Sequence, residues 1–184
     1  MELNRPGTGF ACLPEPNAHA AHGSVCYTAG WGYTSEGGQS TRFLHSINAT
    51  VYSYDECVNS PDTNFNPIDI VEEVEFCAGW TDGTKDACIG DSGGPLICVN
   101  DENEPVLYGI TSWGIGCASD GFPGVYAKIS AIIEWINQTV QSHSSTTAPP
   151  VVTSNSSLLL NSSKRYPADI FTVLRLGTVS YCYD

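Results

Sequence analysis

The stretch Asp86-Ala-Cys-Ile-Gly-Asp-Ser-Gly-Gly-Pro95 combines a serine hydroxyl with three glycines, and this combination suits acyl-transfer chemistry. An acyl-transfer nucleophile needs its hydroxyl on a tight turn, with backbone N–H groups directed at the developing oxyanion. Gly90, Gly93 and Gly94 permit such a turn, because glycine tolerates backbone angles and close approaches that a side chain would block. Taken alone, the stretch is equally compatible with an ordinary glycine-rich turn that carries a solvated serine.

Four shorter strings accompany this stretch and make it specific. In chain order they are Ala29-Gly-Trp-Gly32, Phe76-Cys-Ala-Gly79, Ser112-Trp-Gly114 and Gly124-Val-Tyr-Ala127. With the cysteine positions, they resemble the second half of the peptidase domain in the chymotrypsin/trypsin family of serine proteases, from Cys12 to about Asn137. The resemblance implies an all-β fold, namely an antiparallel six-stranded Greek-key barrel followed by a C-terminal helix. It also implies that a first barrel is missing.

The resemblance assigns roles within one substrate groove. It implies that Ser92 is the nucleophile, that the N–H groups of Gly90 and Ser92 form the oxyanion hole, and that Asp86 is the floor of the pocket for the side chain before the cleaved bond. A carboxylate there pairs with a guanidinium or ammonium group, so we expect a polypeptide substrate cleaved after Arg or Lys. The alternative for Asp86 is a solvated turn residue. The residues implied to line the pocket or to pair with the substrate backbone are Ser112, Trp113, Gly114 and Gly124.

Asp91 has a separate role in the proteins that the chain resembles. There, its carboxylate forms an ion pair with a new amino terminus released by zymogen cleavage. The sequence offers no partner for Asp91, because the chain begins Met1-Glu2 rather than with small apolar residues. A buried carboxylate without a partner costs on the order of several kcal/mol. We therefore expect the pocket loops over 79–91 and 112–117 to be disordered and zymogen-like in this chain.

The catalytic histidine and its orienting aspartate belong to the first barrel in the family. Ala20-Ala-His-Gly23 is similar to the family's Ala-Ala-His-Cys, but it lies where the family has its inter-barrel linker, which favours a solvated loop histidine over a base at His22. His19 and His22 lack a third ligand, so no metal and no cofactor are expected. His45 is expected on a strand surface and His143 in the flexible tail.

Eight cysteines without a Cys-x-x-Cys pair favour a disulfide framework and an oxidising compartment. By resemblance, the internal pairs are Cys26 with Cys98, Cys57 with Cys77, and Cys88 with Cys117. Cys12 matches the position that tethers the catalytic chain of two-chain family members to a propeptide, so the missing barrel or a propeptide is the expected partner there. Cys182 has no family counterpart.

Composition and charge exclude other classes of protein. A net charge of −13 argues against nucleic-acid binding, and no apolar run approaches the length of a membrane span. Glycosylation sequons agree with export, so we expect a secreted glycoprotein; they begin at Asn48, Asn137, Asn155 and Asn161. The N-terminus has neither a basic region nor an apolar run and thus no secretory signal, which suggests a fragment of a longer precursor.

The chain divides into three expected parts. Residues 1–25 form the inter-barrel linker, residues 26–138 the C-terminal half of the peptidase domain, and residues 139–184 a flexible tail rich in Ser, Thr and Pro.

Three patterns predict individual elements. Leu44–Val51 alternates between apolar and polar residues, which predicts a strand. Pro95–Val99 and Val106–Ile110 bracket a polar turn, which predicts a hairpin. Helical spacing predicts a helix that ends near Asn137, with a buried stripe of Ile129, Ile132, Ile133 and Ile136.

Two functions remain open from the sequence. The first is a serine endopeptidase whose upstream half is absent from this chain. These residues alone would then be inactive, because losing a triad member costs about 10⁴–10⁶ in rate. The second is a catalytically inactive protease-like module that binds basic peptides or protease partners through the same pocket. A structural protein that reuses the fold has little support, because the nucleophile and pocket residues are intact.

Overall fold

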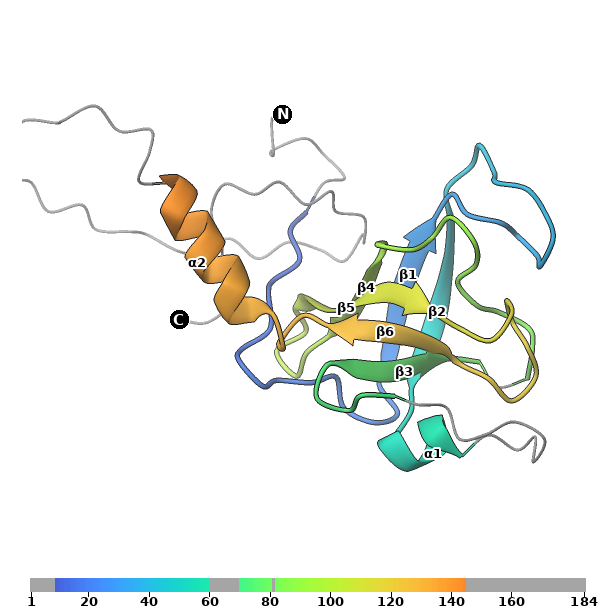
Figure 1. Cartoon of the computed structure of the whole chain (residues 1–184), viewed down its shortest axis with the longest axis horizontal. Helices are drawn as coiled ribbons and strands as arrows, with labels where there is room; N and C mark the ends of the chain where they lie inside the picture. Colours follow the sequence, from blue (N-terminus) through green and yellow to red (C-terminus); the bar gives the residue numbers. More distant parts are fainter. Residues whose placement is uncertain (1–8, 60–69, 81, 145–184) are drawn as a thin grey trace, which may run out of the picture.

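Six strands form one closed barrel in the computed structural model, which describes residues 9–59, 70–80 and 82–144 (Figure 1). Their order around the barrel is β1-β2-β3-β6-β5-β4, and all neighbouring strands are antiparallel. The run β4-β1-β2-β3 has the Greek-key order, so the predicted fold is confirmed. The strands are β1 (Val25–Gly30), β2 (His45–Val51), β3 (Glu75–Gly79), β4 (Pro95–Val99), β5 (Pro105–Trp113) and β6 (Gly124–Lys128).

Alternating side chains fill the barrel. In β2, Ala49 and Val51 are buried, whereas Asn48 and Thr50 on the other face are partly exposed, as the alternation predicted. The interior cluster draws on five of the six strands, with Cys26, Ala49, Val51, Ala78, Leu96, Cys98 and Tyr126 buried together. The apolar face of each strand therefore supplies the core that holds the loops at the barrel's end.

The three disulfides implied by the resemblance are present. Cys26–Cys98 joins β1 to β4 at directly paired positions. Cys57–Cys77 ties the short helix α1 (Tyr54–Val58) to β3. Cys88–Cys117 links the segment before Ser92 to the loop after β5, so it braces two walls of the same site.

Cys12 is disulfide-bonded as well, through a pairing that lies outside the described residues. Cys12 therefore has no free thiol in this structure that could form the expected disulfide to a propeptide or to another barrel. Cys182 is itself outside the described residues.

The segment before β1 is irregular, as expected, but it packs closely on the barrel. The Cys12 N–H donates to the Pro105 carbonyl at 2.8 Å, and the Leu107 N–H donates to the Cys12 carbonyl at 2.9 Å. These bonds form a short parallel bridge to β5, and Pro14 is fully buried beside it. The segment thereby covers the side of the barrel next to the final helix.

The predicted hairpin between β4 and β5 is present, and Asn100 closes its turn. The Asn100 N–H donates to the Glu104 carbonyl at 3.0 Å, while the Asn100 Oδ1 accepts from the Glu104 N–H at 2.7 Å. Asn103 has a left-handed φ of 63°, which asparagine tolerates better than most residues.

The final helix differs from its prediction at both ends. Helix α2 spans Ile133–Ser144, so it begins later and continues past the predicted end near Asn137 and past the predicted boundary at 139. Ile129 precedes the helix because its N–H still pairs with the Tyr108 carbonyl, at 3.0 Å. Ile129 and Ile133 are buried, whereas Ile132 is exposed, so the stripe is narrower than expected.

The end of α2 corrects the placement of His143. His143 belongs to the helix rather than to a tail, and the Ser142 Oγ donates to the Thr139 carbonyl at 2.8 Å within the added turns. Figure 1 shows α2 extending away from the barrel. Residues 145–184, and with them two of the four sequons, lie outside the described residues.

Candidate active site

The turn that carries Ser92 is held by its own backbone. The Asp91 N–H donates to the Cys88 carbonyl and the Gly94 N–H to the Asp91 carbonyl, both at 2.9 Å. The Gly93 N–H donates to the Thr111 carbonyl of β5, and the Thr111 N–H donates to the Gly94 carbonyl, both at 2.9 Å. These bonds fix the serine just before the start of β4. Gly93 adopts a φ of 82°, a conformation that favours glycine. Ser92 itself is exposed at the tip of this turn.

Ser92 and Asp86 line the same cavity, which has a volume of about 200 Å³. The walls include every residue that the sequence placed in the substrate pocket: Ser112, Trp113, Gly114 and Gly124. Three segments far apart in the sequence contribute to it, namely the nucleophile turn, the end of β5 and the start of β6. The structure therefore brings the predicted hydroxyl, carboxylate and glycines together.

Asp86 presents a half-buried carboxylate to this cavity. Its Oδ1 accepts from the Ala87 N–H at 2.8 Å, and its Oδ2 accepts from the Ala118 N–H at 3.1 Å. Burial raises the pKa of Asp86 above its ordinary value, and the two backbone bonds oppose that rise only in part. The loop thus holds an acid whose charge lacks a cationic partner among the described residues, which a cationic ligand would supply.

Gly124 and Gly114 leave room around this carboxylate to different degrees. A Cβ at position 124 would lie 2.9 Å from Asp86 Oδ1, which is closer than real Cβ contacts allow. At position 114 the nearest atoms would be 3.8 Å away or farther, which is an ordinary contact. Any side chain at 124 would therefore displace Asp86, whereas an alanine at 114 would fit.

The two N–H groups expected to form an oxyanion hole are not engaged elsewhere. Within the described part of the chain, neither the Gly90 N–H nor the Ser92 N–H donates to a protein acceptor. Gly90 has a φ of 97°, and a Cβ there would lie 3.1 Å from the Gly32 Cα. Both N–H groups therefore belong to the same turn as the exposed Ser92.

Asp91 has partners that the sequence did not reveal. Its Oδ1 accepts from the Gly32 N–H at 2.8 Å, and its Oδ2 accepts from the Cys88 N–H at 3.0 Å. A Cβ at Gly30 would lie 1.9 Å from Asp91 Oδ1, so the Ala29-Gly-Trp-Gly32 strand end is shaped around this carboxylate. The expectation of an Asp91 without any partner was wrong, because backbone donors leave no signature in side-chain identity.

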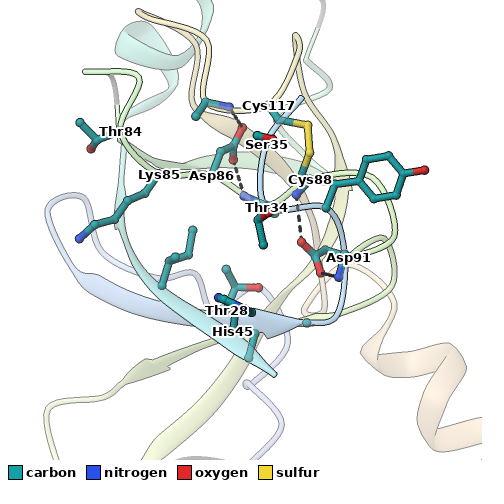
Figure 2. Close-up of a pocket in the computed structure, with 17 residues that line it drawn as sticks. Thr28, Thr34, Ser35, His45, Thr84, Lys85, Asp86, Cys88, Asp91 and Cys117 are labelled. Atoms are coloured by element: carbon teal, nitrogen blue, oxygen red, sulfur yellow. Dashed lines mark hydrogen bonds between the residues drawn. A yellow bond between two sulfur atoms is a disulfide. The ribbon is translucent and has the colours of Figure 1, made fainter. Parts of the chain in front are cut away.

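A second cavity of about 180 Å³ lies beside the first and shares Asp86 with it (Figure 2). Asp91, Lys85 and His45 are among its lining residues, so it contains both signs of charge. Figure 2 shows Asp86 and Asp91 projecting from the same segment, with Cys88 and its disulfide to Cys117 between them. Residues 86–88 and Cys117 therefore line both the cavity with Ser92 and the cavity with Asp91.

None of the histidine side chains that the structure describes lines the cavity with Ser92. His22 contacts Glu56, Nε2 to Oε2 at 2.8 Å, on the exposed surface. Hydrogen bonds from the Ser53 hydroxyl and N–H lower the pKa of Glu56, and His22 adds a smaller effect. No imidazole is among the residues that line the Ser92 cavity. The cavity thus contains an exposed serine hydroxyl and no imidazole from the described residues.

Tyr126 is a cavity residue to which the sequence assigned no role. Its side chain is 1% exposed, and its hydroxyl has no hydrogen-bond partner among the described residues. Burial raises the pKa of Tyr126, and the charge of Asp86 raises it further. The string Gly124-Val-Tyr-Ala127 contained this residue, but only its position in β6 directs the phenol toward Asp86.

Two further features are absent from the described residues. None of their helices has the length and apolarity to cross a bilayer. They also contain no cluster of three or more His, Cys, Asp or Glu side chains arranged to hold a metal ion.

Comparison with known proteins gives consistent matches over most of the chain. A family model described as Trypsin matches residues 2–136. The chain is 39% identical to Trypsin-1 of Salmo salar over 146 residues, which cover 78% of this chain and 56% of that protein. It is 39% identical to a trypsin of Xenopus laevis over 140 residues, covering 76% of this chain and 53% of that protein.

Larger relatives match over a smaller share of their length. The chain is 38% identical to Ovochymase-2 of Mus musculus over 141 residues, which cover 71% of this chain and 23% of that protein. The chain thus spans about half the length of the trypsins that it matches, and less of Ovochymase-2.

Proposed function

Because the chain belongs to the trypsin family of serine proteases, we propose that it forms the substrate-binding half of an endopeptidase that cleaves after Arg or Lys. The observation that carries the proposal is the shared cavity, with an exposed Ser92 at its mouth and the Asp86 carboxylate in its wall. A long cationic side chain that reaches Asp86 leaves its own peptide bond near Ser92. Gly124 supports this role, since it is the position at which a side chain would displace the acid.

The proposed chemistry is acyl transfer. Ser92 Oγ attacks the carbonyl carbon of the residue bound in the cavity, and the carbonyl oxygen becomes an oxyanion. In this mechanism the Gly90 and Ser92 N–H groups, which have no protein acceptor in the described part of the chain, would donate to that oxyanion. The C–N bond then breaks, the amine leaves with a proton, and water later releases the acyl group from Ser92.

The proton of Ser92 requires a base that this cavity does not contain. His22 contacts Glu56 on the surface, and no imidazole among the described residues lines the cavity. We infer that the base is a histidine supplied from outside these residues, and that these residues alone bind cationic peptides without hydrolysing them. Catalysis without a triad member is slower by about 10⁴–10⁶.

Asp91 is proposed to respond to activation, as the family resemblance implied. Its cavity of about 180 Å³ has room for a small apolar residue with a free amino group, whose positive charge would join the two N–H donors already present. Such a group would add an ion pair to Asp91, whose hydrogen bonds to the Gly32 and Cys88 N–H groups are present without it.

The pocket is tested by binding. A fluorescein-labelled tripeptide amide, Gly-Pro-Arg, is titrated with the chain and followed by fluorescence anisotropy. We expect saturable binding, and no binding of the same peptide with citrulline in place of arginine, because citrulline has the same shape without the charge. Equal binding of both peptides would contradict the assignment of Asp86 as a cation site.

The absence of a base is tested by a fluorophosphonate, which reacts with activated serines. We expect no labelling of Ser92 and no hydrolysis of an arginine ester by these residues alone. Rapid labelling that disappears in Ser92→Ala would show that a base is present after all.

A non-catalytic module that binds basic peptides or protease partners is the second candidate, and the lack of an imidazole in the Ser92 cavity favours it. The two candidates differ in the gene. Transcript sequence upstream of the Met1 codon that encodes Ala-Ala-His-Cys in frame supports the endopeptidase, whereas an independent start with its own secretory signal supports the module.

Secretion is also part of the proposal. Three internal disulfides among the described residues are typical of an oxidising compartment. The half-exposed sequon at Asn48, on the outer face of β2, is compatible with a glycan.

A further inference from the structure

Trp113, at the end of β5, makes a hydrogen bond that nothing in the motif strings suggested. Its indole Nε1 donates to Glu75 Oε1 at 3.0 Å. Glu75 begins β3, and β6 lies between β3 and β5 in the barrel, so the bond joins two strands that are not neighbours. Trp113 is 39% exposed and lines the cavity with Ser92. The bond therefore fixes a side chain at the mouth of the proposed site.

A β-bulge gives Trp113 this direction. Thr111 pairs with Tyr126 and Trp113 pairs with Val125, so two residues advance on β5 while one advances on β6. The extra residue, Ser112, has no partner on β6, and bulges re-aim the side chains beside them. Without the bulge, the alternation of β5 would place Trp113 on the opposite face.

Glu75 is a rigid acceptor for the indole. Its Oε2 accepts from the Val71 N–H at 3.1 Å, so both carboxylate oxygens are engaged. Its own N–H donates to the Val71 carbonyl at 2.8 Å, and the adjoining Val74 carbonyl accepts from the Lys128 N–H at 2.8 Å. The backbone of Glu75 and its Oε2 are both held by hydrogen bonds, so the position of Oε1 is restricted. The indole that donates to Oε1 is therefore restricted in its rotamer as well.

We propose that Glu75 is a positioning residue that holds the Trp113 indole as a wall of the groove for the substrate residues that precede the Arg or Lys. This inference rests on the proposed function, since it presumes that a peptide occupies the Ser92 cavity. A peptide that pairs with the edge at Ser112–Gly114 passes Trp113 before its cationic side chain enters the cavity. A fixed indole receives that peptide without losing rotamer freedom on binding, whereas a mobile one must be ordered first.

The contact itself is tested by the indole ¹H–¹⁵N resonances of the full chain. The sequence has four tryptophans, and Trp113→Phe assigns the resonance concerned. We expect Glu75→Ala to move the Trp113 resonance upfield and to leave those of Trp31, Trp80 and Trp135 in place, because only Trp113 loses a charged acceptor. Glu75→Gln, which keeps an acceptor oxygen, should retain most of the downfield shift. An unmoved Trp113 resonance in Glu75→Ala would overturn the contact, and this readout is independent of any ligand.

The consequence is tested with two probes. Benzamidine fills only the cation pocket, whereas the tetrapeptide acetyl-Ala-Ala-Pro-Arg-amide also extends past Trp113. We expect Glu75→Ala to weaken tetrapeptide binding about 2- to 10-fold, the cost of ordering one side chain, and to leave benzamidine binding unchanged. Glu75→Gln should restore tetrapeptide affinity. Glu73→Ala is the matched control. It removes the same charge from an exposed position in the turn just before Glu75, and the Glu73 side chain makes no hydrogen bond among the described residues.

The outcomes distinguish a failure of the positioning role of Glu75 from a failure of the proposed cation pocket. If the unaltered chain fails to bind benzamidine, the cation pocket is wrong, and the substrate role of Glu75 is overturned with it. If benzamidine binds and the ratio of the two affinities is the same in Glu75→Ala and in the unaltered chain, only the positioning role is overturned. An equal loss in Glu73→Ala would show that charge near the groove matters, rather than the bond to Trp113, and would overturn it too.

Discussion

Asp86 and Asp91 lie five positions apart in one segment, yet the structure uses their carboxylates in opposite ways. Asp91 is enclosed by the Gly30–Gly32 strand end and accepts from the N–H groups of Gly32 and Cys88. Asp86 also accepts two N–H groups, but one comes from its immediate neighbour and burial still raises its pKa. The difference indicates that Asp91 stabilises the fold, whereas the charge of Asp86 is less well stabilised by the fold itself, as the proposed cation site requires.

The largest effect is expected from Asp86→Asn. Removing the charge should weaken the binding of benzamidine by about 30-fold to several thousand-fold, because a truncated buried charge pair costs roughly 2–5 kcal/mol. Isothermal titration calorimetry measures this loss. Asp120→Asn, which removes the same charge at an exposed position, should leave the affinity within a factor of about two. Comparable losses in both variants would mean that general attraction, and not Asp86, binds the cation.

Asp91→Asn should instead lower the free energy of unfolding, by about 2–3 kcal/mol. An amide keeps one acceptor oxygen, but its NH₂ group faces the N–H of Gly32 or Cys88, so one donor loses its partner. Urea denaturation measures the change, and hydrogen exchange over residues 88–94 locates it. Stability equal to that of Asp120→Asn would show that Asp91 is not held in this way. Weak protection of 79–91 and 112–117 in the unaltered chain would restore the zymogen-like state that the sequence suggested.

Gly30→Ala tests the enclosure of Asp91 from the other side. The added Cβ would lie 1.9 Å from Asp91 Oδ1, so the turn must shift, at an expected cost of about 1–3 kcal/mol in the free energy of unfolding. Gly9→Ala is the control, because a Cβ at that position meets nothing within 4 Å. Identical denaturation midpoints for the two variants would be incompatible with the close approach described for Gly30.

The smallest expected effect is a pH dependence of benzamidine binding, which arises from the titration of Asp86. Below its raised pKa the carboxyl is neutral and cannot pair with a cation, so benzamidine binding should weaken as pH falls, by at most about tenfold per pH unit. The same raised pKa means that the neutral form is favoured in the fold, and this contribution to stability is lost as pH rises through the folded pKa. Calorimetric titrations over a pH series measure the binding arm. A Kd that stays constant until the ordinary pKa range of aspartate would contradict the shift.

Local chemistry in the sequence was enough to predict several features of this protein. The alternation of Leu44–Val51 predicted β2 because one face of a strand must be apolar to join a core. The glycines around Ser92 predicted its tight turn because few other residues adopt those angles. The resemblance added the disulfide pairing and the barrel, whose order matches the structure.

The remaining features depend on contacts between segments that are distant in the chain, and only the tertiary structure decided them. Backbone N–H groups that bind Asp91 look the same in every sequence, so its partners could not be predicted from residue types. The bulge that turns Trp113 toward Glu75 exists only in the pairing of β5 with β6. Helix α2 begins at Ile133 rather than at Ile129 because a carbonyl on β5 still holds the Ile129 N–H. In each case the deciding hydrogen bond joins groups that periodicity within one segment cannot relate.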